Sequence, residues 1–300
     1  MANKTTSGTL FKPELVKEMF NKVKGRSSLA KLSGAEPMPF SGTDTFVFSM
    51  DGEAAIVGEG GNKPAGDASV SSVTIKPIKF IYQHRVSDEF VNLSDEKRIP
   101  YLRAFSDGFA KKIARALDIA AFHGFNPATG SSSDIVGTNS FAGKVTDSDH
   151  IITYDSSAPD DNIDAAVAAI QTDDGSVSGI AMAPAMGAAI GAMKMTDSGA
   201  AMYPEFRFGG NPPAFGALAS DINSTVSFGT NQKLRAVVGD FANAFRWGFA
   251  EEIPLEIIQY GDPDGQGDLK RTNEIVLRSE AYIGWGILDA DSFALIKVNP

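Results

Sequence analysis

The sequence predicts an α+β fold, because a short helix, a β-ribbon and one long helix precede a body that mixes helices with short strands. In residues 99–123, apolar side chains recur at three- and four-residue steps, the periodicity of an amphipathic helix. In residues 45–86, two stretches alternate apolar and polar side chains, which is the periodicity of strands. These changes of period separate the expected elements.

The composition is that of a folded protein, with 43% hydrophobic and 21% charged side chains in 300 residues. No stretch approaches the roughly 18 to 20 apolar residues that cross a bilayer, and the N-terminus lacks the apolar segment of a secretory signal. We therefore expect a soluble chain with no membrane partner. The absence of cysteine excludes disulfides, thiolate metal sites and cysteine nucleophiles.

The N-terminal segment is predicted to be a basic arm that contains one helix. Pro13 suits the first turn of this helix and Gly25 suits its end. Residues 1–33 contain seven basic and two acidic side chains, a net charge of +5, whereas the whole chain has a net charge of −10. Such an arm suits docking on an acidic neighbour or facing a polyanion, and a solvated charged helix is the simpler alternative. The arm residues expected to contact another subunit are Lys17, Lys22 and Lys24.

Residues 45–86 predict a long antiparallel ribbon whose two arms are the alternating stretches 46–50 and 78–86. The segment 57–67 between the arms is polar and glycine-rich and has no core-facing side. An isolated two-stranded ribbon is marginal in water, and its open edges favour pairing with another chain. The tip residues expected to contact a neighbouring subunit are Gly58, Glu59, Gly60, Gly61 and Lys63.

The long helix is expected to end at His123 and to span roughly 37 Å at 1.5 Å per residue. Residues 160–202 form an alanine-rich helical zone, in which a short strand at 179–183 leads to Pro184 and a second helix that continues to about Met195. Short apolar strands are then predicted at 235–240, 253–258, 273–286 and 293–298.

Recognisable catalytic motifs are missing, so we expect neither an enzyme nor a bound cofactor. The segment 137–144 resembles a nucleotide-binding loop, but its glycines are one residue too far apart and Val145 stands where Ser or Thr is needed. One acidic turn could offer oxygen ligands to Ca²⁺, although Asn273 replaces the bidentate glutamate of an EF-hand loop, and a plain turn is the simpler interpretation. The carboxylates of this candidate metal site are Asp262, Asp264 and Asp268.

Six short segments follow one another along nearly the whole chain. The first three are Phe11–Glu18, Ile56–Pro64 with its Gly-Glu-Gly, and Val86–Phe90. The last three are Val238–Phe241, Leu277–Tyr282 and Gly284–Asp289. In this order they resemble the arm helix, the extended E-loop, the turn before the spine helix and the closing strands of tailed-bacteriophage major capsid proteins with the Hong Kong 97-type fold.

This resemblance implies a fold of four parts. Residues 1–44 would form the N-terminal arm, and residues 45–86 would form the E-loop, a β-ribbon that reaches across a neighbouring subunit. Residues 87–150 and 260–300 would form a peripheral domain that includes the long helix as its spine. Residues 151–259 would form the axial domain.

The resemblance also implies the function of a major capsid protein that self-assembles, in pentamers and hexamers, into the icosahedral head around double-stranded DNA, without sequence-specific binding. Assembly would take place in the cytoplasm of the host bacterium and the product would be the virion. A portal protein, a separate scaffolding protein and decoration proteins would be further partners. Some relatives cross-link an E-loop lysine to an asparagine of a neighbour, and the corresponding residues here would be Lys63 and Asn273.

Three alternatives stay open on the sequence. An encapsulin-like compartment or a gene-transfer-agent shell would share the fold and differ in the contents of the particle. Another virion protein, such as a tail or portal component, would form rings or tubes. A hydrolase or binding protein with an α+β core would need a pocket for which the sequence provides no recognisable parts.

Overall fold

The computed structural model describes residues 27–51, 54–63, 65–93, 95–229, 233–250 and 255–299. The predicted arm helix, with Lys17, Lys22 and Lys24, lies outside these residues.

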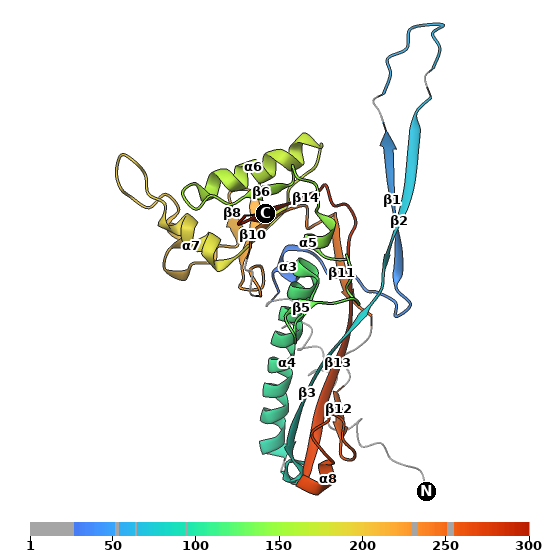
Figure 1. Cartoon of the computed structure of the whole chain (residues 1–300), viewed down its shortest axis with the longest axis vertical. Coiled ribbons are helices and arrows are strands. Elements are labelled where there is room, and N and C mark those ends of the chain that lie inside the picture. Colours follow the sequence, from blue (N-terminus) through green and yellow to red (C-terminus); the bar gives the residue numbers. More distant parts are fainter. Residues whose placement is uncertain are drawn as a thin grey trace.

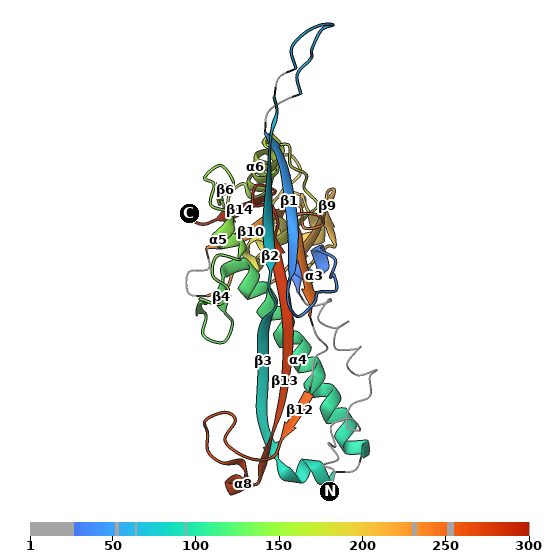
Figure 2. The same cartoon turned by 90° about the vertical axis from the view of Figure 1, so that its right-hand side faces the viewer.

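The molecule has an elongated lower part, an upper body and a projecting ribbon (Figure 1). Helix α4 (Asp95–His123) runs along the lower part, and helix α6 (Pro159–Thr172) lies over the upper body (Figure 1). The ribbon consists of strands β1 (Thr43–Asp51) and β2 (Asp67–Ile75); it stands beside the upper body in Figure 1, and its tip projects past that body in Figure 2. The protein therefore combines helices with sheets in both its lower part and its upper body, in agreement with the predicted α+β class.

Helix α4 begins four residues before its predicted start and ends at His123, where it was predicted to end. Its apolar stripe is buried against the lower sheet, whereas from Ala116 to Phe122 the helix is buried on every side because the upper body covers it. Gly124 follows with a φ of 72°, and its N–H donates to the carbonyl oxygen of Ala120 at 2.9 Å. A left-handed glycine of this kind is a common helix stop.

Gly108 lies in the middle of α4 on the exposed side, and a Cβ atom placed there would have no other atom within 4 Å. We expect Gly108→Ala to raise the free energy of unfolding by roughly 0.5–1 kcal/mol, because alanine restricts the unfolded chain and adds no clash. Urea unfolding of unassembled subunits measures this change. A lower stability would contradict the open helical surroundings of this position.

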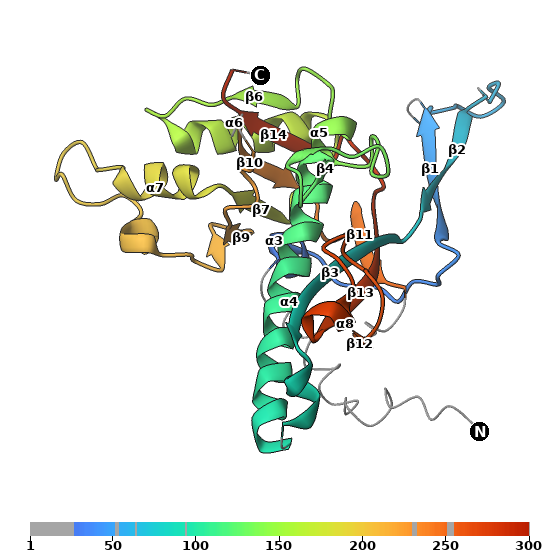
Figure 3. The same cartoon turned by 60° about the horizontal axis from the view of Figure 1, so that its bottom comes forward.

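The lower sheet is built around the long strand β13 (Glu274–Ile287). Strand β3 (Ile78–Ser87) pairs antiparallel with one edge of β13 over the whole length of β3. Strands β11 (Phe245–Phe249) and β12 (Leu255–Ile258) pair with the other edge, one after the other. Figure 3 shows α4 lying along this sheet beside β3.

This pairing corrects the predicted ribbon. The second arm of the ribbon is β2, whereas the segment 78–86, predicted to be that arm, belongs to β3 and pairs with β13. The alternation of β3 arises because Phe80 lies in the core and the rings of Tyr82 and His84 lie 6.3 and 5.0 Å from that of Phe105 in α4. A strand with one face against a helix has the same period as a strand of a free ribbon.

The upper sheet has six strands, and both of its faces are buried. Its strands are, in spatial order, β6 (Ile151–Thr153), β14 (Phe293–Lys297), β10 (Leu234–Gly239), β7 (Gly179–Met182), β9 (Leu218–Ile222) and β8 (Ala214–Phe215). Val238 and Ile296 pack with α6 and α7 (Pro184–Ala192), whereas Val237 and Leu295 pack with the core around the end of α4. Helix α7 ends three residues before Met195, the end predicted for it.

The strand pairings also shift the expected domain boundaries. Strand β14, placed with the spine helix in residues 260–300, lies in the upper sheet between β6 and β10. Strands β11 and β12, placed with residues 151–259, lie in the lower sheet beside β13. The chain therefore passes between the lower part and the upper body more often than the predicted domain boundaries assume.

The remaining elements are α3 (Ser28–Leu32), η1 (Asp88–Asn92), β4 (Phe125–Asn126), β5 (Ser131–Ser132), α5 (Phe141–Lys144), η2 (Pro204–Gly209) and α8 (Leu269–Thr272). Residues 35–38 lie beside β11, where Glu36 donates its N–H to the carbonyl oxygen of Trp247 at 2.9 Å. In the described part of the chain, no helix has the length and apolarity to span a membrane.

Candidate inter-subunit surfaces

The ribbon has one apolar face that is exposed to solvent. Phe46 and Phe48 lie on the same face of β1, and Val70 of β2 stands directly opposite Phe48. These three side chains are 73%, 58% and 64% exposed. Within the described residues, β1 and β2 pair only with each other, so both outer edges of the ribbon are open. Apolar side chains on an open-edged ribbon are typical of a surface that another chain covers.

The base of the ribbon is fixed to the lower sheet through its opposite face. Ile75 is 2% exposed and lies over the two glycines of the segment Gly284-Trp285-Gly286. A Cβ atom at Gly286 would lie 2.7 Å from Cγ1 of Ile75, and one at Gly284 would lie 3.2 Å from Cγ2 of Ile75. The two glycines therefore leave the space into which the ribbon base packs.

The tip of the ribbon, residues 54–63, is exposed throughout. It turns at Gly58–Gly61, where the N–H of Gly61 donates to the carbonyl oxygen of Gly58 at 3.0 Å and Gly60 has a φ of 79°. Ile56 is fully exposed. Of the tip residues expected to contact a neighbour, Glu59 and Lys63 thus have side chains that are open to such contact.

The two residues of the expected cross-link lie at opposite ends of the molecule. Lys63 belongs to the ribbon tip at the top of Figure 1, whereas Asn273 follows α8 at the bottom. Asn273 adopts the left-handed conformation, with a φ of 54°, and terminates α8. A bond between these side chains would therefore have to join two different subunits, and it stays a prediction.

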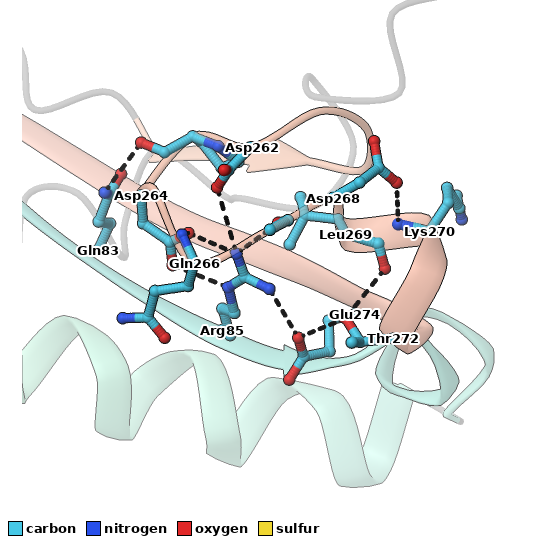
Figure 4. A network of polar contacts seen from close by, with 12 residues as sticks. Gln83, Arg85, Asp262, Asp264, Gln266, Asp268, Leu269, Lys270, Thr272 and Glu274 are labelled. Carbon is cyan, nitrogen blue, oxygen red and sulfur yellow. Dashed lines mark hydrogen bonds and ion pairs between the residues drawn. The ribbon is translucent and has the colours of Figure 1, made fainter.

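Arg85 of β3 organises the acidic turn in which a metal site was considered (Figure 4). Its guanidinium donates to the carboxylate of Asp264 at 2.8 and 2.5 Å, to Glu274 at 2.9 Å and to the carbonyl oxygen of Gly267 at 2.8 Å. Asp262 lies 3.5 Å from the same group. The bidentate geometry with Asp264 is the strongest form of an arginine–carboxylate contact.

This geometry favours the plain acidic turn over the candidate metal site. The guanidinium of Arg85 occupies the position between Asp262 and Asp264 that a cation would take (Figure 4). Asp268 instead accepts the backbone N–H of Lys270 at 2.8 Å and caps α8. Across the described ranges, no group of three His, Cys, Asp or Glu side chains is arranged to hold a metal ion.

Hydrogen bonding to Arg85 lowers the pKa of Asp264 to about 2. The ionised carboxylate therefore favours the folded loop above its ordinary pKa, and this contribution is lost as the pH falls toward 2. We expect Arg85→Gln to return the pKa of Asp264 toward its ordinary value, which a carboxyl NMR titration of unassembled subunits measures. A pKa that stays near 2 in the variant would show that the loop, and not Arg85, sets it.

The first described residues are held by Asp118, which is fully buried in α4. Its carboxylate accepts the N–H of Ser28 at 3.0 Å, the N–H of Leu29 at 3.4 Å and the hydroxyl of Thr225 at 2.8 Å. The hydroxyl of Ser27 donates to it as well. One carboxylate thus joins the start of α3, the long helix and the loop after β9.

A second carboxylate, Asp221 of β9, fixes the same segment to the upper body. It accepts the hydroxyl of Ser28 at 2.6 Å and the amide of Asn211 at 3.0 Å, and it forms an ion pair with Lys31. The chain that continues toward the basic arm is therefore anchored on both bodies of the subunit. Of the seven basic residues of the first 33, Lys31 has a described acidic partner within the same chain.

The sequence did not identify these anchors. Asp118 falls outside the apolar stripe of the helix, yet its side chain is fully buried. The segments that cover it are about 90 residues before it and about 107 residues after it in the chain, so helical periodicity carries no signal of its burial.

Comparisons with known proteins agree on one family. A model of the Phage capsid family matches residues 7–298. A chain from Mycobacterium phage Ogopogo superposes with a TM-score of 0.77 at 33% sequence identity, covering 91% of this chain and 92% of that one. Among curated protein sequences there is no match.

Two further solved structures share the fold at lower identity. A chain from Gordonia phage Cozz has a TM-score of 0.71 at 24% identity and covers 91% of this chain and 87% of that one. The capsid of a native GTA particle, computed with C5 symmetry, has a TM-score of 0.64 at 14% identity and covers 91% and 90%. The overall fold is thus shared with these solved structures, one of which is the capsid of a GTA particle.

Proposed function

The chain belongs to the phage capsid family, and we propose that it is the major capsid protein that self-assembles into the icosahedral head enclosing a double-stranded DNA genome. The observation that carries this proposal is the ribbon with its exposed Phe46, Phe48 and Val70, since a neighbouring copy would cover this apolar face. Capsid proteins are structural components of the virion, so the family assigns the chain a structural role in the shell.

The shell is built from pentamers and hexamers in this proposal. Each ribbon lies across an adjacent copy, the upper bodies surround the symmetry axes as axial domains, and the lower parts form the periphery. The basic arm, through Lys17, Lys22 and Lys24, clamps a neighbour. This arrangement is supported by the open edges of the ribbon and by the two carboxylates that fix the base of the arm.

Assembly takes place in the cytoplasm of the host bacterium, with a portal protein and a separate scaffolding protein, and decoration proteins can bind the finished shell. The shell encloses DNA without sequence-specific binding. The support for these partners is the family alone, since a capsid that packages a genome needs an entry port and a means of setting its size.

A gene-transfer-agent shell is the second candidate function. It is favoured by the similarity to the capsid of a GTA particle, with a TM-score of 0.64 over 91% of the chain. The contents of the purified particle distinguish the two: one defined phage genome in every particle supports the head of a phage, and random fragments of host DNA support the alternative.

Electron microscopy of the assembled protein tests the proposed function. We expect closed icosahedral shells. Rings or tubes would assign the chain to another part of the virion, and subunits that stay monomeric under all assembly conditions would refute a shell protein.

A further inference from the structure

The exposed side of α4 has a row of basic side chains, which we call the basic strip. Its members are Lys97, Arg103, Lys111, Lys112 and Arg115. Lys97 and Arg115 are separated by 18 residues, or about 27 Å at the rise of an α-helix. Between them, Ala104 and Gly108 are small and exposed, so that no large side chain stands above the lysines there.

The charge of the basic strip is opposite to that of the body around it. Residues 95–123, which form α4, contain six basic and four acidic side chains, a net charge of +2. Residues 34–94 and 124–300 together have a net charge of −17. One of the four acidic side chains of α4 is the buried Asp118, which leaves Glu96 and Asp107 as the acidic residues described on the exposed side.

The charges of the strip are available to a partner. Among the described residues, Lys97, Lys111 and Lys112 have no carboxylate within ion-pair distance and no other polar contact. Arg115 is held in place by the hydroxyl of Ser224 at 3.0 Å and the ring of Phe228 at 5.4 Å, and it stays partly exposed. Figure 1 shows the lower sheet on one side of α4 only, and the four strip residues other than Arg115 are exposed to solvent.

We propose that the basic strip of α4 is a binding surface for the phosphate backbone of double-stranded DNA and that this face of the subunit lines the interior of the shell. Lysines and arginines spread along the exposed side of the helix can meet several phosphates of a duplex, and long lysine side chains bind phosphates without reading bases. Residues 34–94 and 124–300 are acidic and repel DNA, so within that part of the subunit contact is favoured on this helix. This inference rests on the proposed role as a DNA-enclosing shell.

The test compares two double variants of the full-length protein as unassembled subunits. Lys111→Gln/Lys112→Gln removes two charges from the strip, and Lys144→Gln/Lys194→Gln removes two exposed charges elsewhere. Binding of a short random-sequence duplex is followed by fluorescence anisotropy over a range of NaCl concentrations. We expect the slope of log K against log salt to fall in magnitude by about 2 in the strip variant, roughly 0.9 for each lost phosphate contact, and to stay unchanged in the control.

Three outcomes would overturn the proposal: no duplex binding by the unaltered protein, the same slope in both variants, or tighter binding of polyglutamate than of DNA at equal charge. The last of these would assign the strip to an acidic protein segment. Electron microscopy of the strip variant tests the proposed function separately from DNA binding. Closed shells formed by this variant would show that the subunit still assembles, whether or not its DNA binding has changed.

Discussion

Asp118→Ala is expected to lower the free energy of unfolding by about 3 kcal/mol or more. The substitution leaves the N–H groups of Ser28 and Leu29 without their buried acceptor, and the hydroxyl of Thr225 loses its partner as well. An unsatisfied buried donor costs roughly 1–3 kcal/mol. Urea unfolding of unassembled subunits measures the loss, and limited proteolysis should cut near residues 27–33 before the rest of the chain unfolds.

The matched control is Asp164→Ala, which removes a carboxylate from an exposed position of α6. We expect it to change stability by no more than about 0.5 kcal/mol, because surface substitutions away from special contacts are nearly neutral. Equal losses in the two variants would show that the buried network around Asp118 contributes nothing of its own.

The same residue predicts a dependence on pH. Burial raises the pKa of Asp118 to about 6, although four hydrogen bonds to the carboxylate oppose the shift. The folded subunit therefore binds this proton more tightly than the unfolded chain, so the contribution of Asp118 to stability is greatest below its ordinary pKa of 3.8 and is lost as the pH rises toward 6. Unfolding at pH 4.5 and 7 should show that Asp118→Asn, which does not titrate, lacks this change.

Local periodicity was enough to predict most of the longer elements. The long helix, β10, β13 and β14 lie within a few residues of their predicted positions, because each has an apolar pattern produced by its own burial. The prediction for the second arm of the ribbon was wrong, and the reason is also physical. In β2, Val70 faces outward and Ile75 faces the body, so its period is weak. In β3, apolar or aromatic side chains recur at every second position from Ile78 to Val86, and only Ile81 departs from the alternation.

Contacts between distant segments were beyond the reach of sequence patterns. Arg85 and Asp264 are 179 residues apart, and neither lies in a motif that points to the other. The acidic turn resembled a cation site because its carboxylates were visible in the sequence and its cation, a side chain of β3, was not. The exposure of the ribbon phenylalanines was also hidden from the sequence. Their alternation predicts a strand, but it does not predict which face of the strand stays uncovered.

Phe46→Ser/Phe48→Ser is expected to abolish shell assembly while the subunit stays folded. In the unassembled subunit both side chains are more than half exposed, so their loss removes little from the core. In the shell, each would be buried by a neighbour, and burial of a phenylalanine contributes roughly 1.5–3 kcal/mol. The double variant should therefore weaken each ribbon contact by about 3–6 kcal/mol, which is two to four powers of ten in the association constant.

The effect is amplified by the geometry of a closed shell, because every subunit would both extend a ribbon and receive one. A defect in one contact is then repeated at every position. We therefore expect the protein concentration needed for assembly to exceed the concentrations that can be prepared, while the circular dichroism spectrum of the subunit is unchanged. The matched control is Ile135→Ser/Phe208→Ser, which removes two exposed apolar side chains that are 79% and 102% exposed outside the ribbon. If the control assembles and the ribbon variant does not, light scattering and electron microscopy assign the defect to the ribbon face. Normal shells from the ribbon variant would mean that the open edges of the backbone, and not Phe46 and Phe48, hold the neighbouring subunit.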